Sequence, residues 1–154
     1  MEVAKNPREE VLVGLCGMAG LRVHEARTVR PSHLDLQTML LTVYGKGEKI
    51  RYVPVSVRCW SAIVGAFMDS LDGDELLFPF CDRTARSMVT RLGKIAQLDR
   101  KISSHDLRAT FATIIMSLEK DMNVVRELLG HASITTTQMY TLAAVEAMRK
   151  AVEF

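Results

Sequence analysis

Apolar residues recur every three to four positions along most of the chain, the spacing of helices that pack one face on a core. The first run follows Asn6 and Pro7, which suit the cap and first turn of a helix; Glu9 fits a capping box, and Gly20 ends the run. The same spacing predicts helices over 22–28, 56–71, 84–97, 103–118, 122–129 and 143–154. A short helix capped by Ser133 is also expected.

Between residues 34 and 55 the pattern changes to the alternation of strands. Three such stretches are predicted at 34–36, 39–44 and 50–55. Gly45-Lys46-Gly47-Glu48 separates the last two and reads as a hairpin turn, because glycine accepts the positive φ angles of such turns. With a buried extended segment at 76–80, the chain is predicted to be α+β and mostly helical, with a small three-stranded antiparallel sheet.

Length and composition fit one domain. The chain has 154 residues, of which 48% are hydrophobic, enough for one core. No apolar run approaches the roughly 20 residues of a membrane span, and the first residues lack a secretion signal. We therefore expect a soluble cytoplasmic protein that does not associate with a membrane. Cys16, Cys59 and Cys81 are widely spaced and are predicted to be buried free thiols.

Charge is clustered along the sequence rather than large in sum. The formal net charge is only +2, below the level at which charge alone indicates a nucleic-acid binder. Basic residues nevertheless gather in three stretches, around Arg22 to Arg30, Lys46 to Arg51 and Arg83 to Lys101, and acids gather elsewhere. Each cluster alone is more often a solvated face, but together they suggest a polarised surface.

The most informative chemistry lies between His105 and Tyr140. His105, Arg108 and His131 precede Tyr140, so three phosphate-binding side chains accompany one potential nucleophile. A tyrosine hydroxyl has a reference pKa near ~10, so ionising it at pH 7 costs roughly 4 kcal/mol, which neighbouring cations can offset. His105 and Arg108 share one face in the first turn of their predicted helix, where free amides and the helix dipole favour an anion.

Five motifs occur in one order along nearly the whole chain. Ala19-Gly20-Leu21-Arg22-Val23-His24-Glu25 and Gly45-Lys46-Gly47-Glu48-Lys49-Ile50-Arg51 come first, and His105-Asp106-Leu107-Arg108, Leu128-Leu129-Gly130-His131 and Thr136-Thr137-Gln138-Met139-Tyr140 follow. Each is weak alone. Together they resemble the arginine, hairpin-lysine, histidine and tyrosine motifs of the tyrosine recombinases, the phage integrase family, and the resemblance implies the catalytic-domain fold of that family.

The resemblance also implies a mechanism. A tyrosine would attack a DNA phosphodiester, leaving a 3′-phosphotyrosyl link and a free 5′-hydroxyl that rejoins a new partner strand. Arginine and histidine donors would hold the phosphate oxygens, a lysine would protonate the leaving oxygen, and no metal or cofactor is expected. The expected catalytic residues are Arg22, Lys46, His105, Arg108, His131 and the nucleophile Tyr140, with Glu25 orienting the helix of the first arginine.

Expected partners follow from the same resemblance. The chain is expected to act on double-stranded DNA at the nucleoid, in the cytoplasm of a bacterium or of a phage-infected host. It is expected to be a homotetramer when full-length, and the isolated chain could be monomeric. Residues 1–154 are read as one catalytic domain without the family's amino-terminal core-binding domain. DNA contacts are predicted at Lys49, Arg51, Arg83, Arg86 and Arg91. The apolar tail could exchange onto a neighbouring protomer or pack on its own domain, and both readings stay open.

Three other functions compete with this reading. A type IB topoisomerase shares the nucleophile and arginines but relaxes DNA without exchanging partners. A non-catalytic DNA-binding remnant or regulator would be free to lose any of the six positions, yet all six are present. A metal hydrolase is disfavoured because His24, His33, His105 and His131 show no ligand spacing such as His-Glu-x-x-His.

Overall fold

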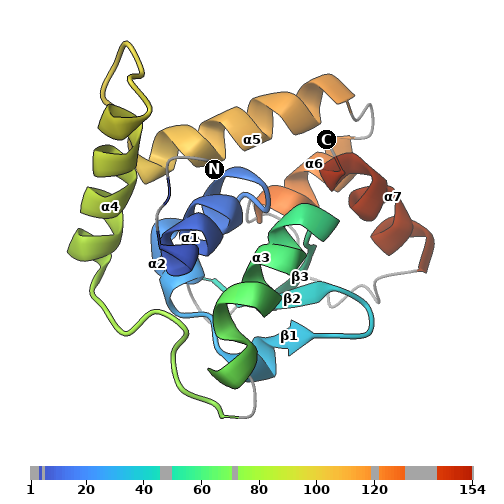
Figure 1. The fold of residues 1–154 in the computed structure, drawn as a ribbon. Coiled ribbons are helices and arrows are strands. Elements are labelled where there is room, and N and C mark those ends of the chain that lie inside the picture. Colours follow the sequence, from blue (N-terminus) through green and yellow to red (C-terminus); the bar gives the residue numbers. More distant parts are fainter. Residues whose placement is uncertain are drawn as a thin grey trace.

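The computed structural model describes residues 4, 6–45, 50–70, 73–118, 122–130 and 142–153 (Figure 1). The helices are α1 (Pro7–Gly17), α2 (Val23–Arg27), α3 (Val57–Phe67), α4 (Asp82–Ile95), α5 (Ser104–Leu118), α6 (Met122–Leu129) and α7 (Leu142–Val152). The strands are β1 (Leu34–Asp35), β2 (Leu40–Tyr44) and β3 (Ile50–Pro54), and short 3-10 turns span Pro31–His33 and Met68–Ser70. The predicted fold class, mostly helical with one small sheet, is confirmed.

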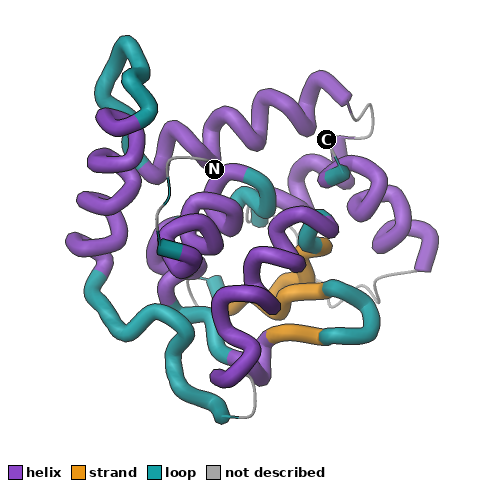
Figure 2. Tube along the Cα trace, viewed as in Figure 1, coloured by secondary structure: helices purple, strands orange, loops and turns teal. Residues whose placement is uncertain are grey.

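The sheet is antiparallel in the order β1-β2-β3 and buries one face. Leu41 pairs with Val53 and Val43 with Arg51, and all four side chains are buried. Tyr44 and Ile50 also pair, but they are exposed. Figure 2 shows the strands as a small patch in a mostly helical molecule. Strand alternation therefore places Arg51 on the inward face, among apolar neighbours.

Two apolar clusters hold the molecule together. The larger joins α1, α2, the sheet and α3, with Phe67 against Phe78 edge to face at 5.3 Å. The smaller joins α5, α6 and α7. Gly20 bridges them, because its α carbon lies so close to Phe111 of α5 that an added Cβ would be 2.4 Å from the ring. The loop between α1 and α2 is thus fixed against α5.

Side chains cap the starts of three helices, and the cap predicted at Asn6 is among them. The Asn6 side chain accepts a hydrogen bond from the Arg8 amide at 2.9 Å, and Ser56 caps α3 through the Cys59 amide. At the start of α5, the Ser103 hydroxyl accepts a hydrogen bond from the Asp106 amide at 3.3 Å, and the Asp106 carboxylate accepts one from the Ser103 amide at 2.9 Å. This reciprocal pair is a capping box with aspartate as its acid.

Several expectations are corrected by tertiary contacts. Helix α4 begins at Asp82 rather than residue 84, and the Glu9 carboxylate pairs with Arg91 of α4. Cys16 and Cys59 are buried as predicted, whereas Cys81 is exposed. The helix predicted after Ser133 lies outside the described residues.

Helix α7 packs on its own domain. Met148 and Val152 are fully buried against α5 and α6, and the Glu153 carboxylate accepts a hydrogen bond from the Val57 amide at 2.9 Å. Arg149 donates to the carbonyl of Thr38. In the single chain, the tail thus packs on its own domain, and its exchange onto a neighbouring protomer stays a prediction. None of the helices in the described part of the chain has the length and apolar character that crossing a bilayer requires.

Candidate active site

Arg22 stands at the amino-terminal end of α2, where the chain leaves the Gly20 turn. Gly20 has φ +66°, a conformation that glycine adopts without strain. The Arg22 amide donates to the Glu25 carboxylate at 2.8 Å, and its guanidinium donates to the same carboxylate at 3.1 Å. The Arg22 side chain stays 50% exposed. Arg22 is therefore held by Glu25, while half of its side-chain surface stays open to a ligand.

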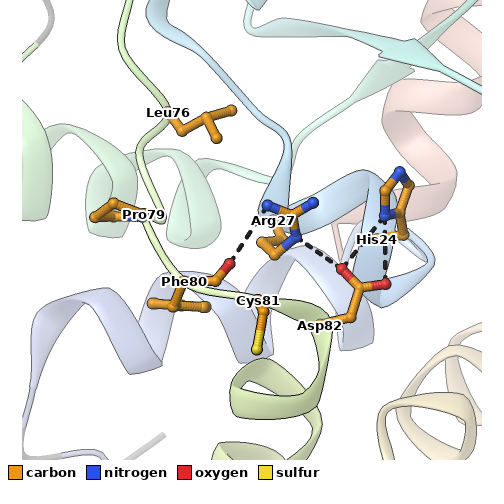
Figure 3. A pocket seen from close by; sticks show the side chains of 7 residues that line it. All are labelled: His24, Arg27, Leu76, Pro79, Phe80, Cys81 and Asp82. Carbon is orange, nitrogen blue, oxygen red and sulfur yellow. Dashed lines mark hydrogen bonds and ion pairs between the residues drawn. The ribbon is translucent and has the colours of Figure 1, made fainter.

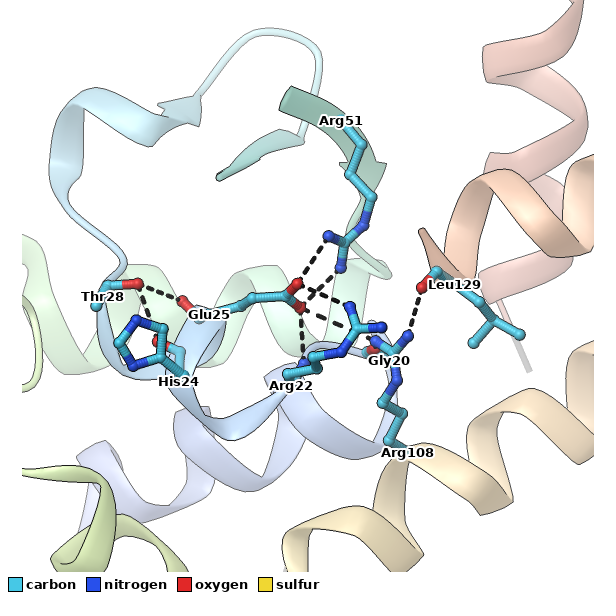
Figure 4. A network of polar contacts seen from close by, with 8 residues as sticks. All are labelled: Gly20, Arg22, His24, Glu25, Thr28, Arg51, Arg108 and Leu129. Carbon is cyan, nitrogen blue, oxygen red and sulfur yellow. Dashed lines mark hydrogen bonds and ion pairs between the residues drawn. The ribbon is translucent and has the colours of Figure 1, made fainter. Parts of the chain in front are cut away.

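Arg108 approaches the same point from α5, but it is buried. Its two terminal nitrogens donate to the carbonyls of Gly20 and Leu129, and one of them lies 3.9 Å from the Glu25 carboxylate (Figure 4). Burial, together with the positive charge of Arg22, lowers the pKa of Arg108 to about 10. The side chain is still a cation at neutral pH, so a buried positive charge is held beside an exposed one.

Glu25 is the carboxylate on which these arginines converge, and Arg51 completes its shell. The two terminal nitrogens of Arg51 donate to the two Glu25 oxygens at 3.0 and 2.9 Å, the forked geometry of a guanidinium and a carboxylate. Burial raises the pKa of Glu25, but the hydrogen bonds and charges of Arg51 and Arg22 outweigh it and bring the pKa to about 2. Glu25 is therefore ionised at any physiological pH.

The network carries more positive than negative charge. Arg22, Arg51 and Arg108 supply three positive charges and Glu25 one negative charge, which leaves +2 (3 − 1) around one buried carboxylate. A phosphodiester carries one negative charge and oxygens that guanidinium groups bind in fork geometry. The arrangement thus suits an oxyanion that approaches the exposed tip of Arg22.

The remaining predicted catalytic residues divide into two groups. His105 is exposed in the first turn of α5, one turn before Arg108. Lys46, His131 and Tyr140 lie outside the described residues, as does Lys49. The structure thus brings Arg22, Arg108 and Glu25 together and shows His105 on the same helix as Arg108, and the roles of all seven stay predictions.

Described residues next to two of these positions do reach the network. Leu129, two residues before His131, provides a carbonyl to Arg108. Gly130 has φ +61°, and a Cβ there would lie 2.9 Å from Cδ and Nε of Arg51. Strand β3, which carries Arg51, begins at Ile50, four residues after Lys46 in the sequence (50 − 46).

The predicted DNA-contact residues occupy different environments. Arg83 and Arg86 are exposed on α4, where Arg86 lies 3.7 Å from the Asp82 carboxylate. Arg91 is half-exposed and pairs with Glu9, whereas Arg51 is buried in the network instead of lying on an open surface. The sequence contains a signal for this burial, because in an extended strand alternate residues point to the same face and the apolar residues Val53 and Val55 alternate with Arg51.

A second polar cluster anchors α2 from another side. It lines an open hollow of about 700 Å³ between α2 and the start of α4 (Figure 3). The Asp82 carboxylate accepts a hydrogen bond from Arg27 Nε at 2.7 Å and lies 3.3 Å from Nδ1 of His24, and Arg27 also donates to the carbonyl of Phe80. These bonds fix the helix that carries Glu25. Within the described ranges, no group of three or more His, Cys, Asp or Glu side chains could hold a metal ion.

Comparison with known proteins adds the family context. The sequence model of the protein family described as "Phage integrase family" matches residues 1–146 of this chain. Tyrosine recombinase XerC of Listeria innocua is 34% identical over 155 residues, covering 92% of this chain and 52% of the relative. The chain thus spans about half the length of the curated relatives it matches.

Solved structures agree on the fold. The XerA recombinase superposes with a TM-score of 0.76 at 32% identity, covering 97% of this chain and 60% of the other. The XerH site-specific recombinase bound to its difH substrate in a pre-cleavage complex gives a TM-score of 0.72 at 26% identity, covering 88% and 43%. The fold described above is therefore found in a protein that was captured on DNA.

Proposed function

Because this chain belongs to the phage integrase family of tyrosine recombinases, we propose that it catalyses site-specific DNA recombination by breaking and rejoining strands through a tyrosine. The observation that carries the proposal is the convergence of Arg22 and Arg108 on Glu25. They come from separate motifs, 86 residues apart (108 − 22), yet meet in one network with surplus positive charge. An anion-binding site of this kind fits a phosphodiester as substrate.

In the proposed first step, the Tyr140 hydroxyl oxygen attacks the scissile phosphorus and its proton passes to His105, which returns it when Tyr140 is released. The new bond joins phosphorus to the tyrosine oxygen, and the bond to the 5′ oxygen of the next nucleotide breaks. Arg22, Arg108 and His131 donate hydrogen bonds to the non-bridging oxygens, where charge increases in the transition state. Donors of this kind are worth roughly 3 kcal/mol each, so three of them supply a large part of the barrier reduction.

The departing 5′ oxygen is far more basic than a phenolate and needs a proton. Lys46 on the hairpin supplies it as general acid, and His105 assists proton transfer and phosphate binding. The free 5′-hydroxyl of another strand then attacks the phosphotyrosyl phosphorus and releases Tyr140. The phosphoester is conserved throughout, so the reaction consumes no cofactor.

The proposed partners are duplex DNA and further copies of the protein. We place Arg83, Arg86 and Arg91 of α4, with Lys49, in contact with the DNA backbone, because exposed arginines and lysines bind phosphates independently of sequence. Arg51 is left out of this set because it is buried. DNA binding is consistent with the XerH structure, which holds its substrate.

Assembly and location complete the proposal. We propose a homotetramer on two DNA sites, in which α7 leaves its own domain and docks on the same groove of a neighbour, because a swapped element re-forms identical contacts. Residues 1–154 act as a catalytic domain of the family. Relatives such as the Listeria protein are bacterial, so we place the activity at the nucleoid in the cytoplasm.

The test is a covalent-trapping experiment. The chain is incubated at high concentration with a library of nicked duplexes randomised around the nick, which lets the 5′-hydroxyl fragment diffuse away after cleavage. Adducts that survive SDS and phenol are sequenced to read the target site. We expect adducts from the wild-type chain and none from Tyr140→Phe. Adducts from both proteins, or from neither, would refute the nucleophile assignment.

A second arm separates recombination from relaxation. Adducts purified on the selected sequence are given either their own 5′-hydroxyl strand or a partner strand from a second labelled duplex. Joining to the second duplex supports strand exchange. Rejoining only to the original strand, with relaxation of a supercoiled plasmid, would instead indicate a topoisomerase.

A further inference from the structure

Arg51 lies where three parts of the predicted active site meet. Its guanidinium forks onto Glu25, which holds Arg22, and its Cδ and Nε pack against the α carbon of Gly130. Its backbone belongs to β3, which begins at Ile50, four residues after Lys46 in the sequence (50 − 46). Its side chain is only 9% exposed, so it cannot itself reach a DNA phosphate.

We propose that Arg51 is a positioning residue of the active site: it engages both oxygens of Glu25 and thereby limits the hold of that carboxylate on Arg22 and Arg108, which bind the substrate phosphate. The inference rests on the proposed function, because that function makes a DNA phosphate the anion that Arg22 and Arg108 bind. It concerns a side chain that touches neither the substrate nor the reacting atoms.

The charge of the network explains why such a residue is needed. With Arg51 present, the network has a charge of +2, and the Glu25 carboxylate has two short bonds to a group that takes no part in binding. Without Arg51, two guanidiniums remain with one carboxylate, for a charge of +1. Arg108 is already within 3.9 Å of Glu25, so the freed carboxylate would compete with the phosphate for both remaining arginines.

The shape of the site explains why the residue is arginine. Two parallel hydrogen bonds to one carboxylate require the planar guanidinium fork, which an ammonium group does not offer. Among the described residues, Nε of Arg51 is buried without a hydrogen-bond partner, so the side chain is held by its two terminal nitrogens alone. The glycine at 130 leaves room for it, because a Cβ at that position would lie 2.9 Å from its side chain.

The experiment compares four proteins with the wild type: Arg51→Met, Glu25→Gln, the double variant, and Arg58→Met. The double variant restores the network charge to +2, carried by Arg22 and Arg108 alone. Arg58 is an exposed arginine of α3 outside the network, so its variant controls for the loss of one positive charge. Far-UV circular dichroism and thermal melting define a temperature at which each protein is fully folded.

Two readouts are taken at that temperature. One is the dissociation constant for inorganic phosphate at fixed ionic strength, by calorimetry. The other is the rate of covalent adduct formation with the nicked duplex. Arg51→Met should weaken phosphate binding about tenfold and slow adduct formation about 10- to 100-fold, as substitutions of supporting residues do elsewhere. Adding Glu25→Gln should recover most of both losses, and Arg58→Met should resemble the wild type.

Other results overturn the proposal. Wild-type phosphate affinity in folded Arg51→Met would show that Arg51 does not limit the hold of Glu25 on the arginines, and a double variant no better than Arg51→Met would show that it does not act through Glu25. If Arg51→Met does not fold, Arg51→Lys, with and without Glu25→Gln, replaces it under the same criteria. The phosphate arm needs no strand cleavage, so failure of the proposed recombination leaves this test intact.

Discussion

Protonation of Glu25 is expected to weaken the folded protein in a narrow acidic range. Burial raises the pKa of this carboxyl group, but the hydrogen bonds and charges of Arg51 and Arg22 bring it to about 2, below its ordinary value of 4.5. A group whose pKa is lowered by folding stabilises the folded state above its unfolded pKa and loses that contribution as pH falls. The loss should therefore begin near pH 4.5 and end near pH 2.

The magnitude follows from the two pKa values. Their difference is about 2.5 units, and each unit corresponds to 1.36 kcal/mol, so ionised Glu25 contributes roughly 3 kcal/mol at neutral pH. The side chain is only 4% exposed, so solvent screening does not reduce this value much. At pH 3 roughly 2 kcal/mol of this contribution to the free energy of unfolding has been lost, because pH 3 lies about 1.5 units below the unfolded pKa of 4.5.

The assay is urea unfolding of the wild type and Glu25→Gln at pH 7, 5, 4 and 3. Asp82 and Asp106 also have lowered pKa values, so both proteins lose stability in acid. Subtracting the two curves leaves the titration of Glu25. The wild type should be more stable at pH 7, and the gap should narrow by about 2 kcal/mol by pH 3. Glu146→Gln, which removes an exposed carboxylate from α7, controls for the loss of one negative charge.

A gap that stays constant from pH 7 to pH 3 would refute the reasoning. It would mean that Glu25 has the same proton affinity in the folded and unfolded chains, and hence that Arg51 and Arg22 do not hold its charged form. A gap that widens in acid would have the wrong sign, and would indicate that burial outweighs the arginines.

Three further outcomes are expected. Gly20→Ala should lower the free energy of unfolding in urea by at least about 2 kcal/mol, because Gly20 has φ +66° and a Cβ there would lie 2.4 Å from the Phe111 ring. Gly65→Ala is the matched control: a Cβ there meets open space in α3, so the variant should raise the free energy of unfolding by about 0.5–1 kcal/mol. Ser103→Ala should cost about 1 kcal/mol by the same assay through loss of the α5 cap. Exposed Cys81, whose pKa the Thr84 hydroxyl lowers, should react with a disulfide reagent in the native protein, while Cys16, whose pKa burial raises to about 12, should react only on unfolding.

Much of the fold could be predicted because local signals and tertiary contacts agree. Ser56 and Ser103 cap the helices that were expected after them, and β2 and β3 flank the glycine-rich turn. The prediction and the structure differ where a contact with a residue far away in the sequence fixes the boundary of an element. Helix α4 starts early at Asp82, whose carboxylate holds Arg27 of α2, and the sequence pattern does not show that contact.

The site was predicted in its parts but not in its organisation. The motifs identified Arg22, Glu25 and Arg108, and the structure places all three in one network. Arg51 was assigned to the DNA surface because it follows Lys46 and Lys49 in a basic stretch. Linear charge clusters do not distinguish an exposed arginine from one that a strand turns inward, and the alternation with Val53 is the feature that does.

Although ionised Glu25 stabilises the fold, the surplus positive charge around it favours the binding of an anion. Three guanidiniums around one carboxylate repel one another, and the positive charge of Arg22 is among the causes that lower the pKa of Arg108 to about 10. One carboxylate compensates only part of three buried or half-buried positive charges, and an uncompensated charge that is removed from water costs free energy. An anion beside Arg22 would relieve that repulsion, so the same imbalance that strains the free protein favours the phosphate-bound one. A DNA phosphate would thus complete the network that Glu25 leaves partly uncompensated.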